Sequence, residues 1–170
     1  MQEELTALAN GLMRRAKAAG VTIVAAESCT AGLLAQVLSD AEGASDSFPG
    51  GFVTYTKAHK TRALGVPAAL LRQKGAVCGE VARAMAEGAL AHSDAGIAAA
   101  ITGVAGPEPD ADGNPVGRVC IAVARRGAPA RDFERHYPDK GRKAIRARAV
   151  ADALKAMARM LASVPVAAGA

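Results

Sequence analysis

Apolar residues follow two different spacings along this chain, and the two spacings predict helices and strands in alternation. Over residues 2–18 the apolar positions recur every three or four residues, which predicts an amphipathic helix that ends near Gly20. Residues 21–26 are instead continuously apolar and rich in β-branched side chains, which predicts a buried strand. The chain therefore begins with a helix followed by a strand.

The same spacings, interrupted by glycine and proline, predict the remaining elements. The predicted helices cover residues 30–39, 57–64, 67–73, 80–91 and 144–161. The predicted strands cover residues 52–56, 95–101, 119–124 and 131–137. Segments 41–51 and 102–117 are predicted loops, and a loop as long as the second is often functional in a compact domain. Strands that alternate with helices predict a layered α/β domain with some parallel pairing.

Length and composition narrow the class of protein. A chain of 170 residues is of the size of one domain, here taken as 1–170, with a frayed tail at 163–170. It contains no apolar run of roughly 18 residues, so no transmembrane helix is expected, and its acidic N-terminus does not resemble a signal peptide. We therefore expect a cytoplasmic protein. The three cysteines and three histidines lack the spacing of a disulfide framework or metal site.

The net charge of +5 arises mainly from basic residues in the last third of the chain. Such a concentration is typical of proteins that bind nucleic acid or a phosphorylated small molecule. Only 3% of the residues are aromatic and none is tryptophan, so the stacking side chains that hold single strands are scarce. We therefore expect a solvated basic helix face rather than a nucleic-acid site. Direct DNA binding would show an affinity that falls steeply with salt.

Candidate chemistry lies in the stretch 21–38, where the first strand turns into the second helix. Ser28 stands in this turn, where free backbone N–H groups favour developing negative charge. It is a candidate nucleophile, although a serine here can also merely cap the helix. Cys29 is a rival nucleophile, or a small buried side chain. Glu27 either orients the substrate or complements the helix dipole.

A nucleophilic serine needs a base, and no histidine of this chain lies in a suggestive motif. Lys57 and Lys60 follow the strand that contains Tyr55, and burial can depress a lysine pKa enough for it to act as a base. Ordinary solvated lysines are the alternative, and spacing alone does not choose between the two. Segment 102–106, TGVAG, offers backbone amides to a ligand or forms a plain turn. The motifs of ATP hydrolysis and dinucleotide binding, GxxxxGK[ST] and GxGxxG after the first strand, are absent.

Six segments taken together resemble the CinA C-terminal domain family, the nicotinamide-nucleotide amidases, from about Leu5 to Leu161. They are AESCTAG (26–32), FPGGFVTYTKAHK (48–60), LGV (64–66), GAVCGEVARAMAEGA (75–89), ITGVAGPEPDADGNPVGRV (101–119) and GRKAIRARAVADAL (141–154). The resemblance implies a three-layer α/β/α sandwich with a mixed, mostly parallel sheet. It also implies hydrolysis of nicotinamide mononucleotide to nicotinate mononucleotide and ammonia, in pyridine-nucleotide salvage, with no metal or other cofactor.

The resemblance also implies residue roles. Ser28 is the expected nucleophile, Lys60 its base and Tyr55 a helper in the same network. The groups expected to hold the substrate or the oxyanion are the helix N-terminal amides, Thr30, Thr102 and Gly103, with Arg142 on the phosphate. The implied assembly is a homodimer or a larger homo-oligomer, without a membrane partner. The alternative function is a non-catalytic nucleotide-binding protein linked to competence or DNA damage.

Two positions depart from the family pattern. Ala31 stands where relatives commonly have glycine, and its methyl group either narrows the pocket or has no effect. Cys78 stands where relatives commonly have serine, so it is expected to be a poorer cap of the helix that follows.

Overall fold

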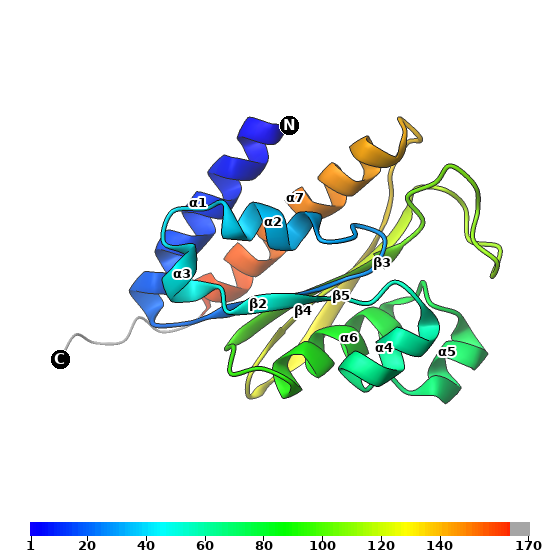
Figure 1. The fold of residues 1–170 in the computed structure, drawn as a ribbon, viewed down its shortest axis with the longest axis horizontal. Coiled ribbons are helices and arrows are strands. Elements are labelled where there is room, and N and C mark those ends of the chain that lie inside the picture. The colour runs from blue at the N-terminus through cyan, green and yellow to red at the C-terminus, as the bar shows by residue number, and fades with distance from the viewer. Residues whose placement is uncertain (164–170) are drawn as a thin grey trace.

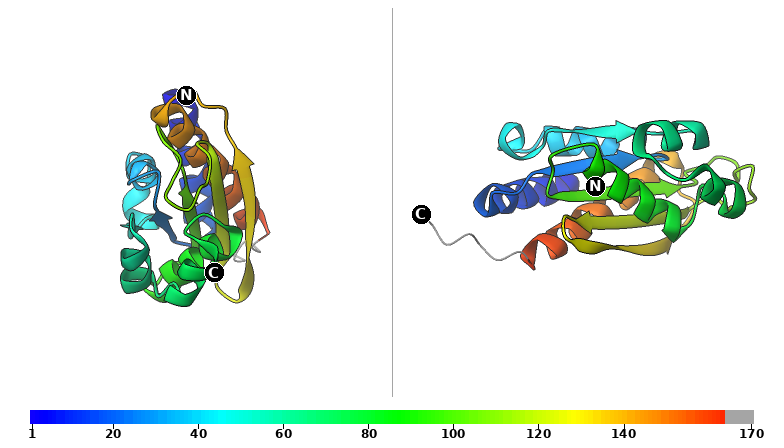
Figure 2. Two further views of the ribbon diagram at one scale, coloured as in Figure 1. Left: turned by 90° about the vertical axis from the view of Figure 1, so that its right-hand side faces the viewer. Right: turned by 90° about the horizontal axis from the view of Figure 1, so that it is seen from below.

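The computed structural model describes residues 1–163 and folds them into a five-stranded sheet between two layers of helices (Figures 1 and 2). Of the predicted frayed tail, all residues after Ser163 lie outside the described part. The helices are α1 (Gln2–Ala19), α2 (Leu33–Ser39), α3 (Ala44–Ser47), α4 (Lys57–Leu64), α5 (Ala68–Lys74), α6 (Gly79–Ala91) and α7 (Arg142–Ala162). The strands are β1 (Ile23–Glu27), β2 (Gly50–Val53), β3 (Ile97–Gly103), β4 (Arg118–Arg125) and β5 (Ala128–His136).

The sheet is mixed, with the strand order β2-β1-β3-β4-β5. Strand β1 pairs in parallel with β2 and β3, whereas β4 pairs antiparallel with both β3 and β5. Within the described residues, β4 is thus the one strand that runs against the other four. Figure 1 shows α1, α2, α3 and α7 on one face of the sheet and α4, α5 and α6 on the other. The predicted sandwich with a mostly parallel mixed sheet is confirmed.

The predicted elements occur in the predicted order, with differences at their ends. Helix α3 lies within the segment that was expected to be a loop. Strand β2 begins two residues before the predicted strand and ends at Val53. Helix α2 begins only at Leu33, because Ala31 and Gly32 adopt left-handed backbone conformations (φ 52° and 98°) that cannot belong to a helix.

Strands β1 and β3 are buried on both faces, which explains why their sequences are almost continuously apolar. In β3, Ile97, Ala99 and Ile101 belong to the core beneath α1 and α7, whereas Ala98 and Ala100 belong to the core beneath α6. Alternation of side chains between the two faces of a strand produces this division. No helix among residues 1–163 is long and apolar enough to cross a membrane.

The carboxyl ends of β1, β2 and β3 meet at one edge of the sheet, where open α/β sheets commonly bind ligands. The Ser28 N–H donates to the Ile101 carbonyl at 2.9 Å, and the Thr54 N–H donates to the Glu27 carbonyl at 2.7 Å. The loop between β3 and β4 projects beyond the sheet (Figure 1). The fold thereby brings three separate segments of the chain around the Ser28 turn.

Candidate active site

A buried lysine lies against the Ser28 hydroxyl. The Lys60 side chain is fully buried, and its Nζ atom is 2.8 Å from Ser28 Oγ and 2.7 Å from the Thr54 carbonyl oxygen. Burial lowers the pKa of Lys60 from its ordinary value of 10.5 to about 8. A fraction of this lysine is therefore neutral near pH 7, and a neutral amine can accept the serine proton.

Helix α4 positions Lys60 because it begins immediately after the segment that leaves β2. Its N-cap is Thr56, whose hydroxyl accepts a hydrogen bond from the His59 N–H at 3.1 Å. Lys57 occupies the first turn of the same helix, where its ammonium pairs with Asp112 at 2.7 Å near the surface. Of the two lysines that the sequence left open, Lys60 contacts Ser28, whereas Lys57 pairs with the β3–β4 loop.

The turn that contains Ser28 is fixed from the α7 side as well as from β3. Arg146 of α7 donates from Nε to the Cys29 carbonyl at 2.7 Å. The Cys29 thiol is buried, and burial raises its pKa to about 12, so the thiol stays protonated at neutral pH. This disfavours Cys29 as the rival nucleophile, because the thiolate is the reactive form.

Glu27 is fully buried and serves helix α2. Its carboxylate accepts hydrogen bonds from the N–H groups of Gly32, Leu34 and Ala35 at 3.1, 3.0 and 2.8 Å. Glu27 does not line the cavity over Ser28, and its three bonds agree with the second of the two predicted roles, support of the helix start. In this structure the α2 amides of Gly32, Leu34 and Ala35, among those expected to hold an oxyanion, are bound to Glu27 instead.

An open cavity of about 330 Å³ lies over Ser28. It brings together five of the predicted site residues, namely Ser28, Tyr55, Thr102, Gly103 and Arg142. The rest of its wall consists of Cys29, Lys57, Ala76, Val77 and the loop residues 104–106, 108 and 110–112. A small molecule in this cavity would contact the Ser28 turn, the end of β3 and the first turn of α7 together.

The predicted residues in the wall differ in how they can act. Tyr55 is 60% exposed, and its hydroxyl has no hydrogen-bond partner within residues 1–163, so it does not join the Ser28–Lys60 pair in this structure. The Thr102 hydroxyl donates to the Ala76 carbonyl at 2.8 Å. Gly103 packs against β4 so closely that a Cβ atom would lie 2.7 Å from the Arg118 carbonyl oxygen, which explains its lack of a side chain.

Thr30 lies away from this cavity. It lines a separate cavity of about 740 Å³ between α1, α2 and α7, and its buried hydroxyl has no hydrogen-bond partner among the described residues. Thr30 is therefore not brought together with the other predicted site residues, because the chain turns away from the Ser28 cavity after Cys29. Arg142 does line the Ser28 cavity, and its Nε donates to the Gly106 carbonyl at 2.8 Å.

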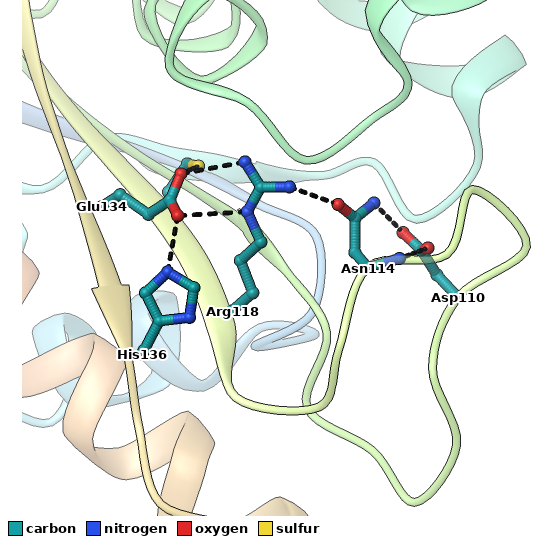
Figure 3. Close-up of polar contacts among 6 residues, drawn as sticks. Asp110, Asn114, Arg118, Glu134 and His136 are labelled. Atoms are coloured by element: carbon teal, nitrogen blue, oxygen red, sulfur yellow. Dashed lines mark hydrogen bonds and ion pairs between the residues drawn. The ribbon is translucent and has the colours of Figure 1, made fainter.

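Sequence reasoning missed two features of the site. The first is the backbone N–H of Cys29, a residue that directly follows Ser28 and lines the cavity. A backbone N–H cannot be recognised from residue type. Its position directly after a candidate nucleophile was the one feature of the sequence that could have indicated it. The second is a polar chain that starts in the cavity wall at Asp110 and runs through Asn114 and Arg118 to Glu134 (Figure 3). Among residues 1–163, no three potential ligands converge in a way that could hold a metal ion.

Comparisons with known proteins agree with this architecture. The family model described as CinA C-terminal domain matches residues 5–161. A Pseudomonas putida protein named nicotinamide-nucleotide amidohydrolase PncC is 40% identical over 159 residues, which is 93% of this chain and 98% of that protein. The crystal structure of competence/damage inducible protein CihA from Agrobacterium tumefaciens superposes with a TM-score of 0.88 at 38% identity, covering 94% of this chain and 96% of that one.

Other relatives are much longer than this chain. A putative competence-damage inducible protein of Symbiobacterium thermophilum is 52% identical over 108 residues, which is 64% of this chain but 25% of that protein. A CinA-like protein of Geobacter sulfurreducens is 50% identical over 107 residues, or 26% of its length. The chain thus spans about a quarter of the length of these relatives.

Proposed function

The chain belongs to the CinA C-terminal domain family, and on that premise we propose that it hydrolyses the carboxamide of nicotinamide mononucleotide to nicotinate mononucleotide and ammonia. The observation that carries the proposal is the 2.8 Å contact between Lys60 Nζ and Ser28 Oγ beside an open cavity. The similarity to the amidohydrolase of Pseudomonas putida, which extends over 98% of that protein, supports the reaction and the substrate. The product suits a role in pyridine-nucleotide salvage.

The first half-reaction transfers the acyl group to Ser28. Neutral Lys60 takes the hydroxyl proton while Ser28 Oγ forms a bond to the carboxamide carbon, with the Thr54 carbonyl orienting the amine. The Cys29 N–H, which directly follows the nucleophile at the cavity wall, is suited to stabilise the resulting oxyanion. The Lys60 ammonium then returns its proton to the amide nitrogen, the C–N bond breaks, and ammonia leaves.

The second half-reaction releases the acid. Lys60, neutral again, takes a proton from a water molecule that attacks the ester carbon, and the same proton returns to Ser28 Oγ when the ester bond breaks. Arg142 keeps guanidinium N–H groups beyond its bond to Gly106, and these groups are suited to the substrate phosphate. Tyr55 stands in the cavity wall, where a bound substrate can draw its hydroxyl into the network.

Ammonia release from nicotinamide mononucleotide by the purified protein tests the proposal. Ser28→Ala should abolish release, whereas Cys29→Ala, which alters the adjacent side chain and keeps its N–H, should retain most of it. Release that persists in Ser28→Ala would refute the serine mechanism. Thermal stabilisation of the wild-type protein by the nucleotide without any ammonia release would favour the non-catalytic nucleotide-binding alternative.

A further inference from the structure

Asp110 contributes to the wall of the Ser28 cavity a negative charge that no cation neutralises within residues 1–163. Its Oδ1 atom accepts hydrogen bonds from the N–H groups of Asp112 and Asn114 at 3.0 and 2.8 Å. Its Oδ2 atom accepts from the side-chain amide of Asn114 at 2.7 Å (Figure 3). All three donors are neutral, so they hold the carboxylate in place without cancelling its charge.

Arg118, the cation in the same chain of contacts, is paired with Glu134 and not with Asp110. Arg118 binds Glu134 with two hydrogen bonds of 3.1 and 3.0 Å, and Glu134 also contacts His136 at 2.7 Å. Asn114 stands between the two charges: its amide nitrogen donates to Asp110, and its amide oxygen accepts from Arg118 at 2.5 Å. Figure 3 shows Asn114 in this intermediate position. A neutral amide therefore separates Asp110 from the guanidinium group.

The other ionised groups of the cavity wall do not neutralise the charge of Asp110. Lys57 pairs with Asp112 at 2.7 Å, so these two charges offset each other. Glu108 adds a further carboxylate, and no ion pair of it occurs within the described residues. Arg142 supplies the remaining cation, from α7. The cavity therefore presents anionic groups on the loop and a cationic group on the helix.

We infer, on the basis of the proposed function, that Asp110 makes this site selective for a carboxamide borne on a cationic pyridinium ring. Nicotinamide mononucleotide carries a fixed positive charge on its ring and negative charge on its phosphate, which matches the two kinds of charge in the cavity. The reduced nucleotide has nearly the same shape and the same phosphate, but its dihydropyridine ring is neutral. A carboxylate in a partly buried wall distinguishes the two, because charge–charge attraction there is screened less than in water.

The test moves the charge without removing a hydrogen bond. Asp110→Asn alone would set two NH₂ groups against each other, so it is combined with Asn114→Asp. In the double variant the amide of residue 110 donates to the carboxylate of residue 114, which now lies against Arg118 and away from the cavity wall. Backbone bonds to residue 110, overall charge and composition stay the same. The negative charge no longer faces the cavity.

Dissociation constants of nicotinamide mononucleotide and its reduced form are measured by calorimetry in a Ser28→Ala background, which prevents turnover. Ser28→Ala alone should bind the oxidised form more tightly, and the exchange of residues 110 and 114 should lower that preference about tenfold. Asp46→Asn is the control: it also removes a carboxylate, but one paired with Lys17 at 2.8 Å on the α3 side, and it should leave the preference unchanged.

Two results overturn the inference. If the preference for the oxidised nucleotide is unchanged after the exchange, the charge of Asp110 does not contribute to recognition of the ring. An equal loss of affinity for both nucleotides shows that Asp110 only supports the loop. If ammonia release from the mononucleotide is present in the wild-type protein in either case, the proposed function stands and the inference alone fails. Absence of both release and binding refutes the proposed function itself.

Discussion

Replacement of Lys60 by methionine separates its chemical role from its effect on stability. Methionine has a similar length and no charge, so it removes the general base while filling most of the space. Because a general base contributes about 10²–10⁴ in rate, kcat/KM for ammonia release should fall by that factor. Lys155→Met is the control: it removes a lysine from a surface ion pair with Glu4 (3.1 Å) that lies outside the Ser28 cavity, and it should retain activity of the same order as the wild-type protein.

The stability effect depends on pH in a direction set by the lowered pKa. Well below pH 8 the lysine is mostly protonated in both the folded and the unfolded protein, so its contribution to the free energy of unfolding changes little. Between pH 8 and its ordinary pKa of 10.5, the unfolded chain still binds the proton that the folded protein has released, so the free energy of unfolding rises with pH. A shift from 10.5 to about 8 corresponds to about 3 kcal/mol in total. Methionine cannot titrate, so Lys60→Met should lack this rise.

Urea denaturation of both proteins at pH 7 and at pH 10 measures the difference directly. The wild-type protein should gain about 2–3 kcal/mol relative to Lys60→Met over this interval. The loss of the hydrogen bonds to Ser28 and Thr54 affects both pH values alike and cancels in the comparison. In the enzymatic assay, wild-type kcat/KM should rise with pH up to about 8 and then level off. A stability difference that is flat with pH would refute the lowered pKa, and with it the neutral amine that the mechanism uses.

Three further changes test other parts of the structure. Glu27→Gln leaves one of the buried amides at the start of α2 without an acceptor and should cost about 2 kcal/mol, seen as a fall in Tm of about 4–8 °C. Arg142→Gln should raise KM for nicotinamide mononucleotide about tenfold with kcat nearly unchanged, and should have little effect with the riboside, which lacks the phosphate. Cys78 caps α6 without a side-chain hydrogen bond, so Cys78→Ser should stabilise the protein by about 0.5–1 kcal/mol in urea denaturation.

The elements of this fold could be predicted from sequence because each of them is encoded locally. The apolar run before Ser28 predicts β1, and the run around Ile97 predicts β3, since both strands are buried on two faces. The antiparallel β4 was not distinguishable from a parallel strand, because strand direction depends on a connection and not on side-chain spacing. The hydrogen bonds at the start of α2 were not predictable for a related reason: their acceptor, Glu27, lies five to eight residues before the amides that it binds.

The geometry of the site required the structure. Lys57 and Lys60 follow Ser28 by 29 and 32 residues, so sequence distance does not choose between them, and only the direction of α4 buries the second and exposes the first. The neutral spacer between Asp110 and Arg118 depends on a loop conformation that no spacing rule describes. Periodicity thus predicts which segments form the site, whereas the pairing of charges within it is set by contacts between segments that are distant in sequence.

Ala31, which stands where relatives commonly have glycine, affects the stability of the turn that contains Ser28 through its backbone conformation. Ala31 is the one non-glycine residue with a positive φ (52°) in residues 1–163, and a left-handed conformation costs an L-residue about 1–2 kcal/mol. Ala31→Gly removes that strain but gives the unfolded chain more freedom, at a cost of about 0.4–1 kcal/mol. The variant should therefore be more stable by about 0.5–1 kcal/mol in thermal denaturation.

Its activity should not change, because Ala31 lines the cavity between α1, α2 and α7 and not the cavity over Ser28. The methyl group consequently cannot narrow the space above the nucleophile. A stabilised variant with altered kcat/KM would show that the backbone at Ala31 sets the position of the Ser28 hydroxyl. That result would contradict the view that the bonds of Ser28 to β3 and of Cys29 to Arg146 are sufficient to fix the turn.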